Sequence, residues 1–188
     1  MQLQAKYKKE IAPKLQAALG LKNVMAVPTL DKVVLNVGLG KALQDAKYLE
    51  VMADVFTRIT GQKPVQTLAK KSIAAFKIRQ GMTIGYKVTL RGKKMWEFIH
   101  KLVTVVLPRV RDFRGISADA FDGHGNYSLG MKEYLPFPEV RQDEVERMHG
   151  LEIVVATTAP DDAGAFQLLT MLGFPFKQKD KKDKKSQA

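Results

Sequence analysis

The chain has 188 residues, 45% of them hydrophobic, and a formal net charge of +12, so it can bury one ordinary core and favours a nucleic acid or another anionic surface as its partner. It contains no cysteine, which excludes disulfides and thiolate metal sites. The basic N-terminus leads into no apolar signal core and no run approaches the ~20 apolar residues of a membrane span, so we expect a cytoplasmic protein.

The first predicted element is an amphipathic helix, because apolar residues recur at helical spacing from Leu3 to Ala18 and Gly20 is a suitable stop. Pro13 lies inside this pattern and should kink or divide the helix near Ala12, since proline lacks the amide hydrogen. The lysines off the apolar stripe form either a solvated face or an RNA-facing one, and the sequence leaves both open: Lys6, Lys8, Lys9 and Lys14.

A strand is predicted over residues 30–38, followed by the glycine-rich turn Gly38–Lys41 and a helix with an apolar stripe at Leu49, Met52, Phe56 and Ile59. The turn fails both nucleotide fingerprints. Leu43 stands where a dinucleotide motif needs glycine, and Ala42 stands where a Walker loop needs Ser or Thr. We interpret it as a plain turn, with an RNA phosphate contact as the alternative.

The stretch Val55–Trp96 contains ten Lys and Arg residues and no Asp or Glu, which is typical of a polyanion-binding site. Pro64–Ala69 predicts a short strand in which both faces mix polar and apolar residues, so its polar face cannot be assigned. Residues 82–91 then alternate with a period of two. One face is apolar (Met82, Ile84, Tyr86, Val88, Leu90) and the other is polar or small (Thr83, Gly85, Lys87, Thr89, Arg91).

Residues 70–81 join these two strands and mix apolar with basic side chains, a combination that suits stacking on bases while neutralising phosphates. We expect Phe76 to be available for such stacking. Ile73 and Ile78 are expected to fold back onto the core instead.

Gly92 breaks the strand, and an apolar stripe at Met95, Ile99, Leu102 and Val106 then predicts a helix closed by Pro108. Trp96 is expected to pack at the edge of this helix. Residues 109–150 are irregular, which indicates either a functional surface or a missed assignment, and their weak strand candidates are Asn126–Met131 and Tyr134–Phe137. His124 is expected in a turn rather than in a metal site, because no ligand residues repeat at suitable spacing around it.

Leu151–Thr158 predicts a strand, and Pro160 with Asp161 and Asp162 predicts the start of a last helix. The expected core positions of that helix are Phe166, Leu169 and Leu172. Residues 177–188 are expected to form a disordered basic tail, since their only apolar residue is the terminal alanine.

Four separated segments, residues 60–92, 107–117, 121–133 and 151–159, together resemble the family of bacterial large-subunit ribosomal protein number five. The resemblance covers roughly Tyr7–Phe176. It implies an α+β fold, with an open, largely antiparallel sheet, helices packed on one face and the other face polar for RNA. It also implies a non-enzymatic ribonucleoprotein component that acts in translation without metal or cofactor.

The partners that this resemblance implies are 5S rRNA in the central protuberance, large-subunit rRNA, peptidyl-site tRNA and small-subunit ribosomal protein thirteen across an intersubunit bridge. The implied bridge region is Arg109–Arg147. Leu68, where a basic residue is common, and the tail beyond Phe176 depart from the family pattern. Together with the polar strand face, the resemblance gives as rRNA-binding candidates Lys32, Asn36, Gly38, Gln62, Lys63, Lys87, Thr89 and Arg91, and as tRNA-contacting candidates Ser72, Phe76, Lys77, Arg79 and Gln80.

Two other classes of protein would need features that this sequence does not show. An RNA-modifying enzyme needs a nucleophile, a general base or a cofactor fingerprint, and the scattered His100, His124 and His149 supply none of these. A peripheral membrane protein needs a helix with a wide apolar face opposed by lysines. We expect partners that are neither membrane nor DNA, and a ribonuclease-treated pull-down separates these classes, because only an RNA-mediated association is lost.

Overall fold

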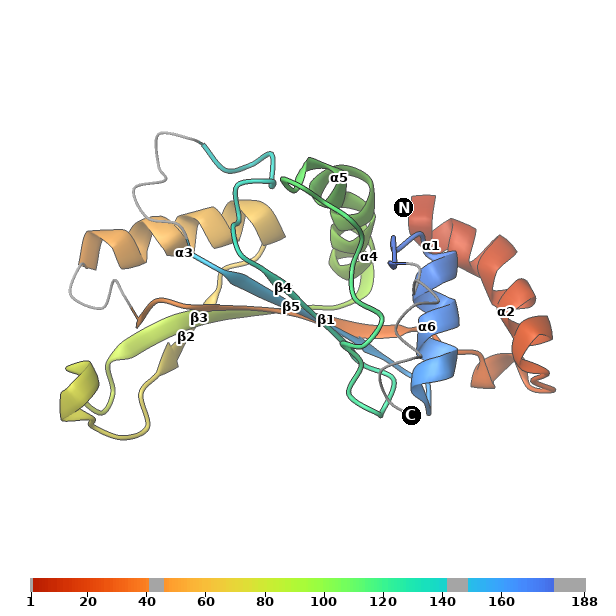
Figure 1. Ribbon diagram of the computed structural model, residues 1–188, viewed down its shortest axis with the longest axis horizontal. Helices are drawn as coiled ribbons and strands as arrows, with labels where there is room; N and C mark the ends of the chain where they lie inside the picture. Colours follow the sequence, from red (N-terminus) through yellow and green to blue (C-terminus); the bar gives the residue numbers. More distant parts are fainter. Residues whose placement is uncertain (1, 41–45, 142–148, 178–188) are drawn as a thin grey trace, which may run out of the picture.

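A computed structural model describes residues 2–40, 46–141 and 149–177. Its centre is a five-stranded sheet in the order β2-β3-β1-β5-β4, in which all neighbouring strands are antiparallel (Figure 1). The α+β prediction is therefore confirmed. The strands are β1 Leu30–Gly38, β2 Val65–Leu68, β3 Thr83–Leu90, β4 Tyr127–Met131 and β5 Leu151–Thr157.

The period-two pattern of β3 sets which side chains face the core. Val33 pairs with Leu90 and Leu35 with Val88, and all four side chains are at most 2% exposed. Their neighbours along each strand point to the opposite face, because successive strand residues alternate. The predicted alternation is confirmed, although Met82 precedes the strand and Arg91 follows it.

Helices cover one face of this sheet and leave the other open (Figure 1). Helix α3 Ala46–Thr60, helix α4 Gly92–Lys101 and helix α5 Leu107–Arg109 lie on that one side. Met52, Phe56 and Ile59 of the predicted stripe are buried, whereas Leu49 is only partly buried. The layer of apolar side chains between helices and sheet forms the core.

The N-terminal helix is divided as Pro13 predicts. Helix α1 Gln2–Lys6 leads through a π-helical turn, Tyr7–Ile11, into helix α2 Ala12–Leu19, with Pro13 in the first turn of α2. The π turn faces the core through Tyr7, whose hydroxyl donates a hydrogen bond to the carbonyl of Pro28 over 2.8 Å and whose ring lies 5.2 Å from that of Trp96. Trp96 is a packing residue, as expected.

Two predictions made near prolines are wrong: the end of one helix and the presence of one strand. The helix expected to close at Pro108 continues to Arg109, because a wider π turn at Leu102–Val106 precedes it and Pro108 occupies the first turn of α5. Tyr134–Phe137 forms a turn rather than a strand, and the amide of Phe137 donates to the carbonyl of Tyr134 over 3.2 Å. Pro136 supplies no amide hydrogen to a strand ladder.

Helix α6 Asp162–Met171 starts two residues later than Pro160, because Asp161 caps it by accepting a hydrogen bond from the amide of Gly164 over 3.2 Å. Leu169 and Leu172 are buried as predicted, but Phe166 is 37% exposed, so its assignment to the core is wrong. The buried stripe passes through Ala165 and Leu168 instead. Residues 178–188 of the expected tail and the Lys41 end of the glycine-rich turn lie outside the described residues. Lys177, the first residue of that tail, is ordered, because its amide donates to the carbonyl of Ile116 over 2.9 Å.

Candidate nucleic-acid interface

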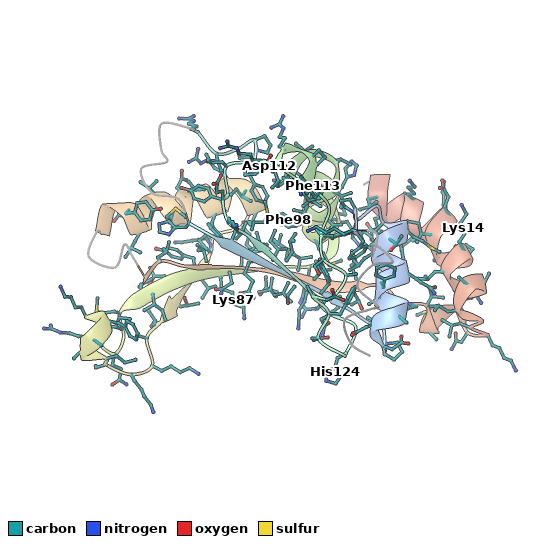
Figure 2. All side chains as sticks on the ribbon, in the orientation of Figure 1. Lys14, Lys87, Phe98, Asp112, Phe113 and His124 are labelled. Carbon is teal, nitrogen blue, oxygen red and sulfur yellow. The ribbon has the colours of Figure 1, made fainter. Side chains whose placement is uncertain are left out.

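The open face of the sheet gathers side chains that are far apart in the sequence. Asn36 of β1 pairs with Lys87 of β3, and Val34 pairs with Thr89. Figure 2 shows Lys87 on the side of the sheet away from the helices. Lys32 lies on the same face of β1, and Gly38 is exposed at the end of that strand. The central strands therefore present Asn36, Lys87 and Thr89, with Val34 between them, on a surface that none of the described helices covers.

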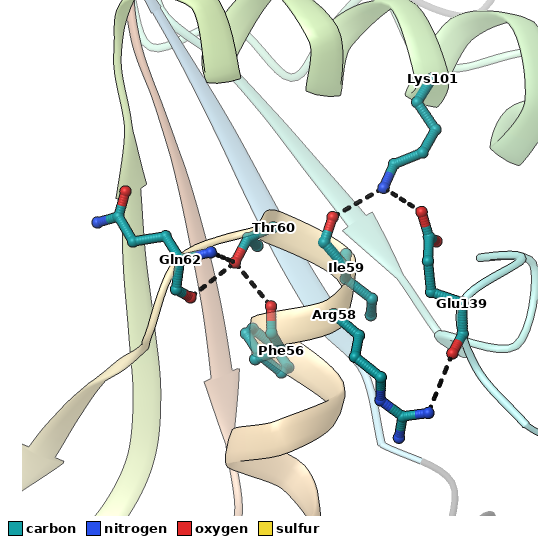
Figure 3. A network of polar contacts seen from close by, with 7 residues as sticks. All are labelled: Phe56, Arg58, Ile59, Thr60, Gln62, Lys101 and Glu139. Carbon is teal, nitrogen blue, oxygen red and sulfur yellow. Dashed lines mark hydrogen bonds and ion pairs between the residues drawn. The ribbon is translucent and has the colours of Figure 1, made fainter.

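The connection from α3 to β2 brings Gln62 to the edge of this face. The amide of Gln62 donates to the Thr60 hydroxyl oxygen over 3.3 Å, and the Thr60 hydroxyl lies 2.6 Å from the carbonyl of Phe56, at the end of the helix (Figure 3). From there the Gln62 side-chain amide donates to the carbonyl of Thr89 over 3.4 Å. Lys63 follows and is exposed, so both predicted residues lie beside the polar face of β3.

Carboxylates that the local sequence pattern did not reveal also reach this face. Arg91 forms an ion pair with Asp31 over 2.7 Å, and Lys32 lies 3.9 Å from the same carboxylate. The side-chain amide of Asn36 donates to Glu152 of β5 over 3.4 Å. The face therefore carries oriented, partly neutralised groups. Its net positive charge is smaller than the run of Lys and Arg in the sequence suggests.

Gly85 keeps β3 close to β1 at one end of the open face. A Cβ atom at this position would lie 2.2 Å from the carbonyl oxygen of Val37, so a larger residue would push the two strands apart. Gly38 opposite has open space around it. The exposed backbone of Gly38 is therefore open to close approach by a ligand at this end of the face.

The tip of the β2–β3 hairpin is a second basic surface, and it projects from the far end of the sheet (Figure 1). The amide of Gln80 donates to the Ser72 hydroxyl over 2.9 Å, and Ile73 pairs with Ile78 across the tip. Phe76 is 67% exposed, as predicted. Ile73 is 44% exposed and Ile78 is half-buried, so their predicted place in the core is wrong. These two side chains hold the tip together instead.

The tip exposes its cations around Phe76. Lys77 adopts the left-handed conformation with φ +54°, which ends a short 3₁₀ turn, and both it and Arg79 are exposed. The amide of Arg79 donates to the sulfur of Met82 over 3.1 Å. Leu68, at the end of β2, is 53% exposed. An aromatic ring flanked by cations on an ordered turn can stack on a base while pairing with phosphates.

The irregular region after α5 does not lie on one side of the molecule. Asp112 and Phe113 lie on the helix side, whereas His124 lies on the opposite side (Figure 2). On the helix side the segment of residues 132–141 is anchored by Lys101, which donates to Glu139 over 2.5 Å and to the carbonyl of Ile59 over 2.7 Å (Figure 3). Residues 142–147 of the expected bridge lie outside the described part of the chain.

The turn around His124 is organised by Asp122. This carboxylate accepts hydrogen bonds from the Asn126 side chain over 2.7 Å and from the backbone amides of His124 and Asn126 over 2.9 and 3.0 Å. These bonds, the Asn126 side chain first, lower the pKa of Asp122 from 3.8 to about 2. His124 is a turn residue, as predicted.

This lowered pKa predicts how the turn responds to acid. Because the pKa is lower in the folded chain than in the unfolded one, the carboxylate stabilises the turn fully above pH ~4, and the effect disappears as the pH falls towards 2. An NMR titration of the Asn126 side-chain amide should show a transition near pH 2. A midpoint near 4, or an unchanged profile in Asp122→Asn, would contradict this role.

Within the described residues, no cluster of three or more His, Asp and Glu side chains could hold a metal ion. No helix in that part of the chain is long and apolar enough to cross a membrane.

Comparison with known proteins gives a consistent result along almost the whole sequence. A family model described as ribosomal protein L5 matches residues 23–79, and a second model, described as the C-terminus of the same ribosomal protein family, matches residues 83–176. Large ribosomal subunit protein uL5 of Halothermothrix orenii is 53% identical over 176 residues, covering 94% of this chain and 98% of the relative. The uL5 proteins of Symbiobacterium thermophilum and Desulfatibacillum aliphaticivorans are each 54% identical, and each comparison also covers 94% of this chain and 98% of the relative.

Proposed function

The chain belongs to the ribosomal protein L5 family, and from that premise we propose that it binds 5S rRNA in the central protuberance through the open face of its sheet. As a member it is a structural constituent of the large ribosomal subunit in the cytoplasm, not an enzyme. The expected family and the expected non-enzymatic role are thereby confirmed. The RNA that the sheet binds and the residues that contact it belong to the proposal.

One observation carries this proposal: the candidates for rRNA binding are drawn from three separate stretches of sequence, yet all lie on or beside the uncovered face of β1 and β3. Gly38 leaves the backbone of β1 open to approach at one end of the face, and Arg91 and Asn36 are held in place by neighbouring side chains. Oriented polar groups of this kind contact the 2′-hydroxyls, sugars and phosphates that RNA displays along a helix.

The charge of Lys87 provides the test. Lys87→Glu should weaken 5S rRNA binding roughly 10- to 150-fold, the equivalent of ~1.5–3 kcal/mol for a lost charge-assisted contact, and should reduce the salt dependence. Because Lys87 is exposed, the circular dichroism spectrum and the melting curve of the variant should not change. Filter binding measures the affinity.

Arg109→Glu is the matched control, since it makes the same reversal of charge at the exposed end of α5, on the helix side. It should leave 5S rRNA binding within about two-fold of the unaltered chain, because surface charges beyond a Debye length are screened. Equal losses for both variants would mean that net charge, and not the open face, governs binding.

We further propose that the hairpin tip contacts peptidyl-site tRNA and that the helix-side part of the irregular region bridges to small-subunit protein thirteen. Support for the first is the ordered, exposed group of Phe76, Lys77 and Arg79 at a distance from the open face. Support for the second is the anchoring of residues 132–141 on α4, away from the proposed RNA face. Large-subunit rRNA remains a further expected partner.

A further inference from the structure

An aromatic groove lies between helix α6, residues 118–121 and residues 174–177. Its volume is about 1040 Å³, and Phe121, Phe166 and Phe176 are among the residues that line it. The ring centroids of Phe166 and Phe176 are 4.7 Å apart, and that of Phe121 lies 6.1 Å from Phe176. Phe166 is 37% exposed, so a ligand in the groove would meet an aromatic surface.

The rim of this groove is acidic. Asp119 and Asp162 line it, and Asp162 accepts hydrogen bonds from the backbone amides of Gly123 and Gly125 over 3.1 and 2.9 Å. These neutral donors orient the carboxylate without cancelling its charge. Aromatic rings attract cations through their electron-rich faces, and carboxylates attract them by charge. The groove therefore suits lysine side chains and repels the phosphates of RNA.

A lysine-rich segment begins at the edge of the groove. Lys177 is one of the lining residues, and its amide is fixed by a hydrogen bond to the carbonyl of Ile116 over 2.9 Å. The sequence continues through residues 178–188 with five lysines and two aspartates. The family match ends at residue 176, so this segment lies outside the part of the chain that resembles the family.

We propose that residues 178–188 dock in the aromatic groove of their own chain, with lysine ammonium groups over Phe166 and beside Asp119 and Asp162. The attachment at Lys177 makes this contact intramolecular. Eleven residues of a random-coil chain span roughly 17–20 Å on average. Such a tether raises the local concentration to about the millimolar range, so weak individual contacts are sufficient. Docking keeps these lysines away from RNA until salt or a competing polyanion releases them.

The first test uses the absence of cysteine in the chain. A nitroxide attached to Ala188→Cys, diluted into unlabelled protein, should broaden the NMR signals of Asp119, Phe166 and Gln167 more than those of β1 and β3. The broadening should disappear at ~1 M salt, where the Debye length is about 3 Å. Uniform broadening, or broadening confined to the open sheet face, would overturn the proposal.

The second test measures the same contact between two molecules. A peptide of residues 178–188, added to the chain truncated after Lys177, should bind roughly two- to five-fold more weakly when Phe166→Leu removes the aromatic face and keeps an apolar side chain. Asp119→Asn should weaken it similarly. Glu97→Gln, an exposed change on α4, is the matched control and should have no effect. If the peptide bound the truncated chain and its three variants with equal affinity, docking in the groove would be disproved.

Discussion

Replacing residues 70–81 by an Asn-Gly pair should leave the protein folded and able to bind 5S rRNA, and should abolish its contact with peptidyl-site tRNA. Residues 70–77 and 79–81 are exposed and Ile78 is half-buried, so the tip adds little to the core. The amide of Ala69 donates to the carbonyl of Met82 over 2.9 Å, so the ladder is already closed below the tip. An Asn-Gly turn fits a two-residue connection at that point.

Phe76→Ala separates stacking from charge within the same tip. Losing one stacked ring costs about 1–3 kcal/mol, so tRNA contact should weaken while Lys77 and Arg79 keep their electrostatic attraction. Chemical footprinting of peptidyl-site tRNA on assembled ribosomes measures this contact, beside a melting curve and a 5S filter-binding assay. A stable, 5S-competent deletion with unaltered tRNA protection would eliminate the hairpin as the tRNA contact.

Local pattern in the sequence was enough to predict the elements that carry these two surfaces. The alternation over residues 82–91 predicted which side of β3 is polar, because the side-chain period of a strand is independent of its neighbours. The same pattern could not reveal that Asp31 pairs with Arg91, sixty residues away, or that Glu152 reaches Asn36. Such contacts depend on strand order, which a single sequence does not encode locally.

The wrong assignments at Ile73 and Phe166 have one cause. An apolar residue in an amphipathic pattern is usually buried, but both of these lie where the chain runs past the edge of the core. Ile73 pairs with Ile78 in the hairpin tip, and Phe166 joins a cluster of rings at the groove. The π turns in the two helical segments were equally hidden, because the wider turn preserves most of the helical periodicity.

Lys101→Met should produce the largest loss of stability among the polar changes considered. Lys101 is partly buried, pairs with Glu139, donates to the carbonyl of Ile59 at the end of α3 and lies 5.9 Å above the ring of Phe98. Removing it leaves a partly buried carboxylate without its cation, at a cost of about 2 kcal/mol once solvent screening is allowed for. The expected fall in Tm is roughly 4–8 °C.

Lys94→Met is the matched control, because Lys94 is also on α4 and donates to a carbonyl at the end of α3, that of Gly61 over 2.6 Å, but is exposed. It should cost less than ~1 kcal/mol. A double-mutant cycle with Glu139→Gln isolates the ion pair. Because the pair holds residues 132–141 on the helix side, Lys101→Met should also slow association with the small subunit and leave 5S binding unchanged. Equal destabilisation by Lys94→Met and Lys101→Met would show that both lysines act only as caps of α3.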